Sequence, residues 1–89
     1  MQVWKLTPLD LTDPNWEASS HRGIAIVRAK TEKAARAAAS KAFDVAVRFP
    51  PGKGVRTPPW ARAALVKVEL TEDPRYEPVG PVQVLEPPL

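Results

Sequence analysis

Residues 23–43 read GIAIVRAKTEKAARAAASKAF, in which a strand pattern is followed directly by a helix pattern. The first part, 23–30, is rich in β-branched residues and predicts a β-strand. Alanine dominates 31–43, and alanine has the highest intrinsic preference for the α-helix. Thr31 is a favourable N-cap residue, and Glu32 would lie in the positively polarised first turn. The stretch therefore predicts one strand and one helix in immediate succession.

The alanines of the predicted helix recur at helical spacing and form a smooth face of small side chains. This face is expected to pack against a sheet, with Phe43 adding bulk at its end. The alanines of this face are Ala35, Ala38, Ala39 and Ala42. The opposite side is expected to carry Lys33, Arg36, Ser40 and Asp44.

Three further segments have strand patterns. Residues 2–6 alternate, so that Trp4 and Leu6 would share the side that faces the core. Residues 61–70 also alternate between apolar and charged side chains and predict an amphipathic strand. Residues 45–49 are expected to form a strand as well, because valine favours strands and two prolines follow.

Together these elements predict an α+β fold in a single domain, residues 1–89. A small antiparallel β-sheet of three or four strands would carry one helix on one face, in the order β-β-α-β-β, because a lone helix among strands does not suit a parallel sheet. The tail, 79–89, contains three prolines and is expected to be an edge strand or a proline-rich C-terminal arm. The loop 8–23 is long for so small a domain, and Trp16 is expected to hold it against the core.

The net charge of +3 is distributed unevenly. Residues 1–20 hold one cation and three acids, residues 21–67 hold eleven cations and two acids, and residues 68–89 hold one cation and five acids, which gives −2, +9 and −4. The basic centre could form a face for nucleic acid or for an acidic protein. Alternatively, the acidic ends could fold back against it and leave an ordinary mixed surface.

The chain has no cysteine, which excludes disulfides, thiolate zinc sites and a cysteine nucleophile. No apolar run approaches the ~20 residues of a membrane-spanning helix, and the N-terminus lacks the pattern of a secretory signal. We therefore expect a cytoplasmic protein with no membrane partner and no cofactor.

Residues 48–60, RFPPGKGVRTPPW, combine four prolines and two glycines with three cations and no acid. They would join the strands predicted at 45–49 and 61–70 as the tip of a long, stiff hairpin. Cations at this tip would neutralise phosphates, and an exposed aromatic ring would stack on an unpaired base. Trp60 is explained equally well as a buried side chain that holds the loop against the core. The candidate contact residues for nucleic acid or an acidic partner are Arg48, Lys53, Arg56, Trp60 and Arg62.

No catalytic or metal-binding motif stands out. The Gly-Lys-Gly of 52–54 lacks the earlier glycine, the following Ser or Thr and the helix of a phosphate-binding loop. His21 follows two serines, but a catalytic triad is defined by positions in space rather than by adjacency along the chain. The acids Asp10, Asp13 and Glu17 do not have the spacing of a calcium loop. We therefore expect no catalytic residue, no metal site and no enzymatic activity.

The remaining features favour binding. Small sheets present edge strands that recruit other chains, and a core of this size is often completed by dimerisation. The sequence therefore predicts a small non-enzymatic binding or accessory protein that acts through protein–protein contact, with a protein partner or as a homodimer. The alternative is a nucleic-acid-binding module that uses the basic loop 48–62.

Overall fold

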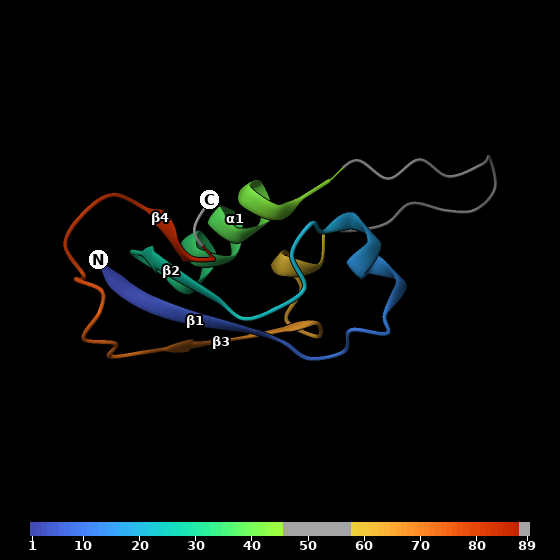
Figure 1. The fold of residues 1–89 in the computed structure, drawn as a ribbon, viewed down its shortest axis with the longest axis horizontal. Helices are drawn as coiled ribbons and strands as arrows, with labels where there is room; N and C mark the ends of the chain where they lie inside the picture. The colour runs from blue at the N-terminus through green and yellow to red at the C-terminus, as the bar shows by residue number, and fades with distance from the viewer. Residues whose placement is uncertain (46–57, 88–89) are drawn as a thin grey trace.

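The computed structural model describes residues 1–45 and 58–87. Along the chain, the elements follow one another as strand, strand, helix, strand and strand, with two short 3-10 helices (η) between them (Figure 1). They are β1 (Gln2–Pro8), η1 (Pro14–Ala18), β2 (Ala25–Ala29), α1 (Glu32–Phe43), η2 (Pro59–Ala61), β3 (Val66–Leu70) and β4 (Gln83–Glu86).

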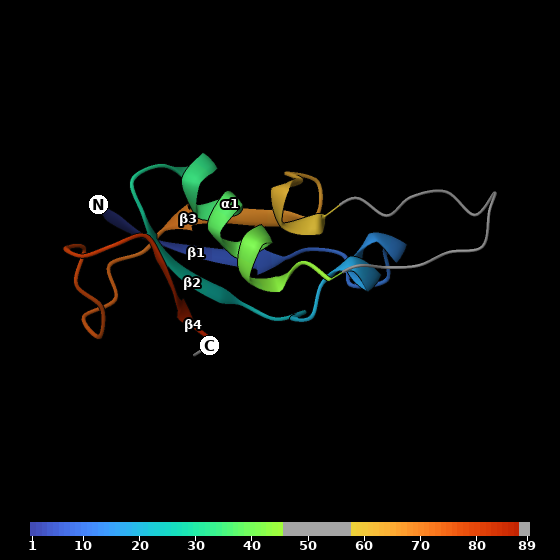
Figure 2. The ribbon, with the colours of Figure 1, turned by 90° about the horizontal axis from the view of Figure 1, so that it is seen from above.

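The four strands form one sheet in the spatial order β3-β1-β2-β4, and every neighbouring pair is antiparallel. The helix α1 lies across one face of this sheet (Figure 2). The predicted α+β class, a small antiparallel sheet with one helix, is confirmed. The order across the sheet differs from the order along the chain, because β3 and β4 lie at opposite edges.

The fourth strand of the described sheet comes from the tail, where the sequence analysis allows an edge strand or an arm. Of the strand predicted at 45–49, only Val45 is described, and it lies outside the strands. The rest of that segment and the predicted hairpin tip up to residue 57 lie outside the described residues. The fourth strand is β4, which comes from the proline-rich tail 79–89 and pairs with β2 at the edge of the sheet.

The alternation predicted for 2–6 is present in β1. Leu6 is fully buried in the core. Trp4 is half-buried beside the core, and its indole Nε1 donates a hydrogen bond to the carbonyl of Ala29 at 3.0 Å. The opposite side of the strand carries Val3 and Lys5, so β1 has one face toward α1 and one face away from it.

The helix α1 begins at the predicted N-cap. The Thr31 Oγ1 accepts a hydrogen bond from the backbone N–H of Ala34 at 3.1 Å, which satisfies one of the unpaired donors of the first turn. The buried face of the helix consists of Ala35, Ala39 and Phe43. The predicted face also included Ala38 and Ala42, which are only half-buried.

Within residues 1–45 and 58–87, no helix is long and apolar enough to span a membrane.

Arg36 does not face solvent as predicted. Its side chain is 13% exposed, and its guanidinium donates to the carbonyl of Val66 at 3.0 Å and to the carbonyl of Trp60 at 3.4 Å. A long arginine stem can pack against apolar neighbours while its planar head supplies several donors. The helix is therefore rotated about its axis relative to the prediction, with Arg36 turned toward η2 and β3.

The two 3-10 helices meet next to the C-terminal end of α1. Trp16 of η1 and Trp60 of η2 are both fully buried and contact each other edge to face, with ring centroids 5.4 Å apart. Phe43 is the last residue of α1, and its ring centroid lies 5.2 Å from the ring centroid of Trp60. The prediction that Trp16 holds the long loop 8–23 against the core is confirmed.

Candidate functional site

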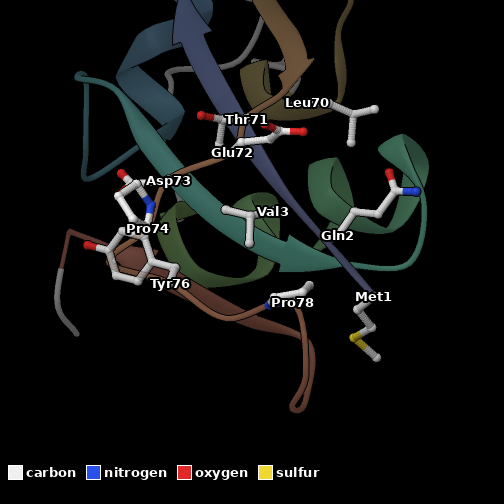
Figure 3. Close-up of a pocket in the computed structure, with 10 residues that line it drawn as sticks. All are labelled: Met1, Gln2, Val3, Leu70, Thr71, Glu72, Asp73, Pro74, Tyr76 and Pro78. Atoms are coloured by element: carbon white, nitrogen blue, oxygen red, sulfur yellow. The ribbon is translucent and has the colours of Figure 1, made fainter.

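A groove of about 690 Å³ opens where the beginning of β1 lies beside the end of β3. The antiparallel pairing of the two strands brings these segments together, and the N–H of Thr71 donates to the carbonyl of Val3 at 3.0 Å. In Figure 3, Val3 lies in the middle of the lining residues, with Met1 and Tyr76 on opposite sides of it. The groove is lined by Met1, Gln2, Val3, Leu70, Thr71, Glu72, Asp73, Pro74, Tyr76 and Pro78.

The far wall of the groove belongs to the connection between β3 and β4, residues 71–82. These strands lie at opposite edges of the sheet, so the connection has to cross both β1 and β2. Arg28 of β2 holds the crossing in place through two hydrogen bonds and makes a third to the first residue of β4. Its guanidinium donates to the carbonyl of Pro81 at 2.9 Å, to the carbonyl of Glu77 at 3.2 Å and to the side chain of Gln83 at 3.0 Å.

Gly80 allows this close approach of the crossing segment to Arg28. Its φ of +139° is a conformation that residues with a side chain rarely adopt. A Cβ at this position would lie 2.7 Å from the Cζ of Arg28. The backbone conformation therefore favours glycine here, and the absence of a side chain leaves room for the Arg28 guanidinium.

The two charged side chains that line the groove, those of Glu72 and Asp73, are both acidic. Asp73 accepts hydrogen bonds from Arg75, including one from Nη2 at 2.7 Å, and these hydrogen bonds lower the pKa of Asp73 to about 2. Arg75 also lies 3.4 Å from the carboxylate of Glu86 on β4. Asp73 is therefore ionised but already paired, whereas the exposed carboxylate of Glu72 lies at the groove without a hydrogen bond or ion pair in the described part of the chain.

Tyr76 forms an apolar wall with a polar tip. Desolvation raises the pKa of its phenol, and a hydrogen bond to the Glu86 carboxylate raises it further, so the hydroxyl stays protonated at neutral pH. The guanidinium of Arg75 lies over the ring, 5.3 Å from its centroid. These contacts fix the ring at one side of the groove.

The groove is suited to a ligand that carries apolar side chains next to a cation. Leu70 and Met1 are 60% and 47% exposed, so they present apolar surface that the fold does not cover. Glu72 supplies a negative charge next to that surface. Concave, mostly apolar sites with a few placed polar groups are the usual form of ligand and peptide sites in proteins.

Of the residues predicted as a contact surface, the structure describes Trp60 and Arg62. Trp60 is fully buried, and its Nε1 donates to the Oγ of Ser19 at 2.8 Å, so of its two possible roles the structure shows the one in the core. Arg62 is exposed at the end of η2. Arg48, Lys53 and Arg56 lie outside the described residues.

The side chains of Ser19 and His21 do not contact each other as a triad would require. The Ser19 hydroxyl donates to the backbone carbonyl of His21 at 2.6 Å and accepts from the indole of Trp60. The His21 ring packs against Phe43, with centroids 4.9 Å apart, and its Nε2 lies 3.2 Å from the carbonyl of Ile24. Among residues 1–45 and 58–87, no group of three or more His, Asp or Glu side chains could hold a metal ion.

Sequence reasoning missed the groove because its parts lie far apart along the chain. One signal was present in the sequence, since four acids fall between residues 69 and 77, next to the strand end at Leu70. The sequence analysis treats this acidity only as charge that could fold back against the basic centre. Its position beside Met1 and Val3 depends on strand pairing, which the sequence pattern does not specify.

Comparisons of the chain with protein-family models, with curated proteins and with solved structures found no match, so the interpretation of the groove rests on its geometry.

Proposed function

We propose that this protein is a non-enzymatic binding module, and that its groove receives an apolar segment of a partner protein. The observation that carries the proposal is an apolar groove of about 690 Å³ in which the charged side chains of the lining, Glu72 and Asp73, are both acidic. This volume lies within the range typical of ligand sites, about 300–1,000 Å³. It would accommodate a few aliphatic or aromatic side chains of an extended peptide.

The charge around the groove defines the expected partner. Residues 68–89 carry a net charge of −4, with one cation and five acids. Glu72 is exposed at the groove and would attract a lysine or arginine of the partner. The expected ligand is therefore a segment in which apolar residues are flanked by cations.

The same charge argues against a phosphate backbone as the ligand of this groove, because acidic side chains repel it. The nucleic-acid alternative would use the loop 48–62 instead. Within the described part of that loop, Trp60 is buried and unable to stack on a base, and Arg62 is an exposed cation. No observation favours this alternative over the groove.

Two matched peptides test the proposal. One has two adjacent leucines flanked by lysines, and the other has the same leucines flanked by glutamates. Titration of each into ¹⁵N-labelled protein should shift the amide signals of Val3, Thr71 and Tyr76, with tighter binding of the lysine peptide. Glu72→Lys should remove or reverse this preference, whereas Glu17→Lys, on η1 outside the groove, should leave it unchanged.

The same titration with a single-stranded oligonucleotide separates the two functions. Shifts around Arg62 together with no response to either peptide would favour the nucleic-acid alternative. A lysine peptide that binds no better than the glutamate peptide would contradict the role of the acidic lining.

A further inference from the structure

A tight turn connects Asp73 and Tyr76, two residues that line the groove, through Arg75, which does not line it. The N–H of Tyr76 donates to the carbonyl of Asp73 at 3.1 Å and closes the turn. The N–H of Arg75 donates to the Asp73 carboxylate at 3.0 Å, as backbone groups two residues after an aspartate often do. The backbone of the turn therefore holds Arg75 directly beside the groove.

The guanidinium of Arg75 lies among three groups that attract a cation. Its Nη2 lies 2.7 Å from one carboxylate oxygen of Asp73, and its Nε lies 3.0 Å from the other. The same Nη2 lies 3.4 Å from the Glu86 carboxylate, and the guanidinium lies over the ring of Tyr76. Carboxylates and aromatic faces are the groups that recognise guanidinium in proteins. An arginine of the chain itself therefore fills a cation site beside the groove.

The two carboxylates of the lining consequently differ in what they offer to a ligand. The side chain of Asp73 is 16% exposed and is paired with Arg75. Glu72 is exposed and makes no hydrogen bond or ion pair with the described part of the chain. In Figure 3, Asp73 lies near Tyr76, whereas Glu72 lies toward Leu70. The two acids would therefore meet different parts of a bound peptide.

We propose that Arg75 is a specificity-determining residue that makes the groove selective for ligands with a single cation. This inference rests on the proposed function of the groove. Because Arg75 neutralises Asp73 from within the chain, Glu72 is the one unpaired charged side chain of the described lining. One lysine or arginine of the ligand finds a partner there. A second cation beside Asp73 would lie close to the guanidinium of Arg75, which repels it.

Removal of the Arg75 charge should turn Asp73 into a second point of attachment. Arg75→Gln is the suitable change, because the backbone hydrogen bonds of the turn do not involve this side chain. The hydrogen bond between the Tyr76 hydroxyl and Glu86 also does not depend on it. In the variant, the little-exposed carboxylate of Asp73 would lack its cation, and a second lysine of the ligand could supply one.

Calorimetric titration at low ionic strength with three peptides tests the inference. All three contain two adjacent leucines, with a lysine before them, a lysine after them or a lysine on both sides. The quantity measured is the gain in affinity that the second lysine brings over the better one-lysine peptide. For the wild-type protein this gain should stay within about twofold, and for Arg75→Gln it should rise to about three- to fivefold, the size of a partly exposed ion pair. Adding Asp73→Asn to Arg75→Gln should return the gain to within about twofold, because the freed carboxylate is then absent.

Arg22→Gln is the matched control, because it removes the same charge from an exposed residue near the end of β2 that pairs with Leu6, away from the groove. It should leave the gain at the wild-type value, since exposed charges beyond a Debye length are largely screened.

The possible results separate this inference from the proposed function. A purely structural role of Arg75 would weaken all three peptides together, and that result would overturn the inference. An equal gain in the wild-type protein and Arg75→Gln would also overturn it, although binding of the peptides would still support the proposed function. If no peptide bound to any of the proteins, both the proposed function and the inference would be wrong.

Discussion

The hydrogen bond between Trp60 and Ser19 joins two segments that are far apart along the chain. Ser19 is 4% exposed, and its hydroxyl is the acceptor for the buried indole N–H of Trp60 at 2.8 Å. Ser19→Ala would leave that donor without an acceptor and should lower the free energy of unfolding by about 1–3 kcal/mol. Urea denaturation followed by tryptophan fluorescence measures the loss. Ser20→Ala, at the exposed neighbouring residue, is the control. An equal loss of unfolding free energy for Ser20→Ala would contradict this role of the Ser19 hydroxyl.

Gly80 is a second position where one residue type is favoured. Gly80→Ala combines an unfavourable positive φ with a contact to the Arg28 guanidinium and should cost about 1–3 kcal/mol of stability. Gly23→Ala is the comparison, because its φ is not in the positive region and the nearest atom to a new Cβ would be the His21 Cε1 at 3.2 Å. Chemical denaturation of both variants measures the difference. If Gly80→Ala were no more damaging than Gly23→Ala, the crossing segment would not be held as described.

The two residues predicted least well, Arg36 and Trp60, are governed by partners outside their own segments. Arg36 was assigned to the solvent side because helical spacing places it opposite the predicted alanine face. In the structure it supplies donors to the carbonyls of Trp60 and Val66, which come from η2 and β3. Trp60 could be interpreted as either exposed or buried, because the residues that bury it, Trp16, Ser19 and Phe43, lie far from it along the chain. Local patterns contain no information about such partners.

At the scale of elements, the packing of α1 on the sheet gives a direct test of its orientation. Ala39 is fully buried against the core, so Ala39→Leu should overpack the interface and lower stability by about 1–3 kcal/mol. Ala37 is exposed on the same helix, and Ala37→Leu should change stability by less than about 0.5 kcal/mol. Thermal denaturation of the two variants compares them. Equal effects would show that the helix has a different buried face.

The elements that the sequence predicted correctly are those with local determinants. The strands within 2–6 and 23–30 follow from alternation and β-branched residues, and the helix after Thr31 follows from alanine content and the cap. β4 was uncertain because its prolines allow either an edge strand or an arm. Its pairing with β2 requires the crossing segment 71–82, whose path is fixed by long-range hydrogen bonds from Arg28.

At the scale of the whole molecule, folding uses part of the basic centre internally. Arg28 and Arg36 donate hydrogen bonds to carbonyls of other segments and are not exposed. Two cations of the basic centre are therefore partly buried and bound to the fold instead of extending into solvent. Two acids of the C-terminal part, Glu72 and Asp73, line the groove. The acidic residues of this part are therefore not all placed against the basic centre.

The pH dependence of stability should reflect the pairing of Asp73 with Arg75. The folded state lowers the pKa of Asp73 from 3.8 to about 2, so the ionised form stabilises the fold fully above pH 3.8, and this contribution is lost as the pH falls toward 2. Burial raises the pKa of Asp44, so the ionised form of Asp44 destabilises the fold. Its contribution to stability therefore changes with pH in the opposite direction to that of Asp73. Asp73→Asn should weaken the loss of stability in acid, measured as the urea midpoint against pH. Glu77→Gln removes an exposed carboxyl from the same segment, and an equally large effect of that change would contradict this assignment.

The central claim is that the groove between the start of β1 and the 71–82 segment binds an apolar peptide flanked by cations. The most direct test is paramagnetic broadening by the lysine-flanked leucine peptide carrying a nitroxide label at one end. The account predicts selective broadening of the amide signals of Val3, Thr71 and Tyr76, which Glu72→Lys weakens at a given peptide concentration. Broadening centred on η2 and Arg62, or no selective broadening at any peptide concentration, would contradict it.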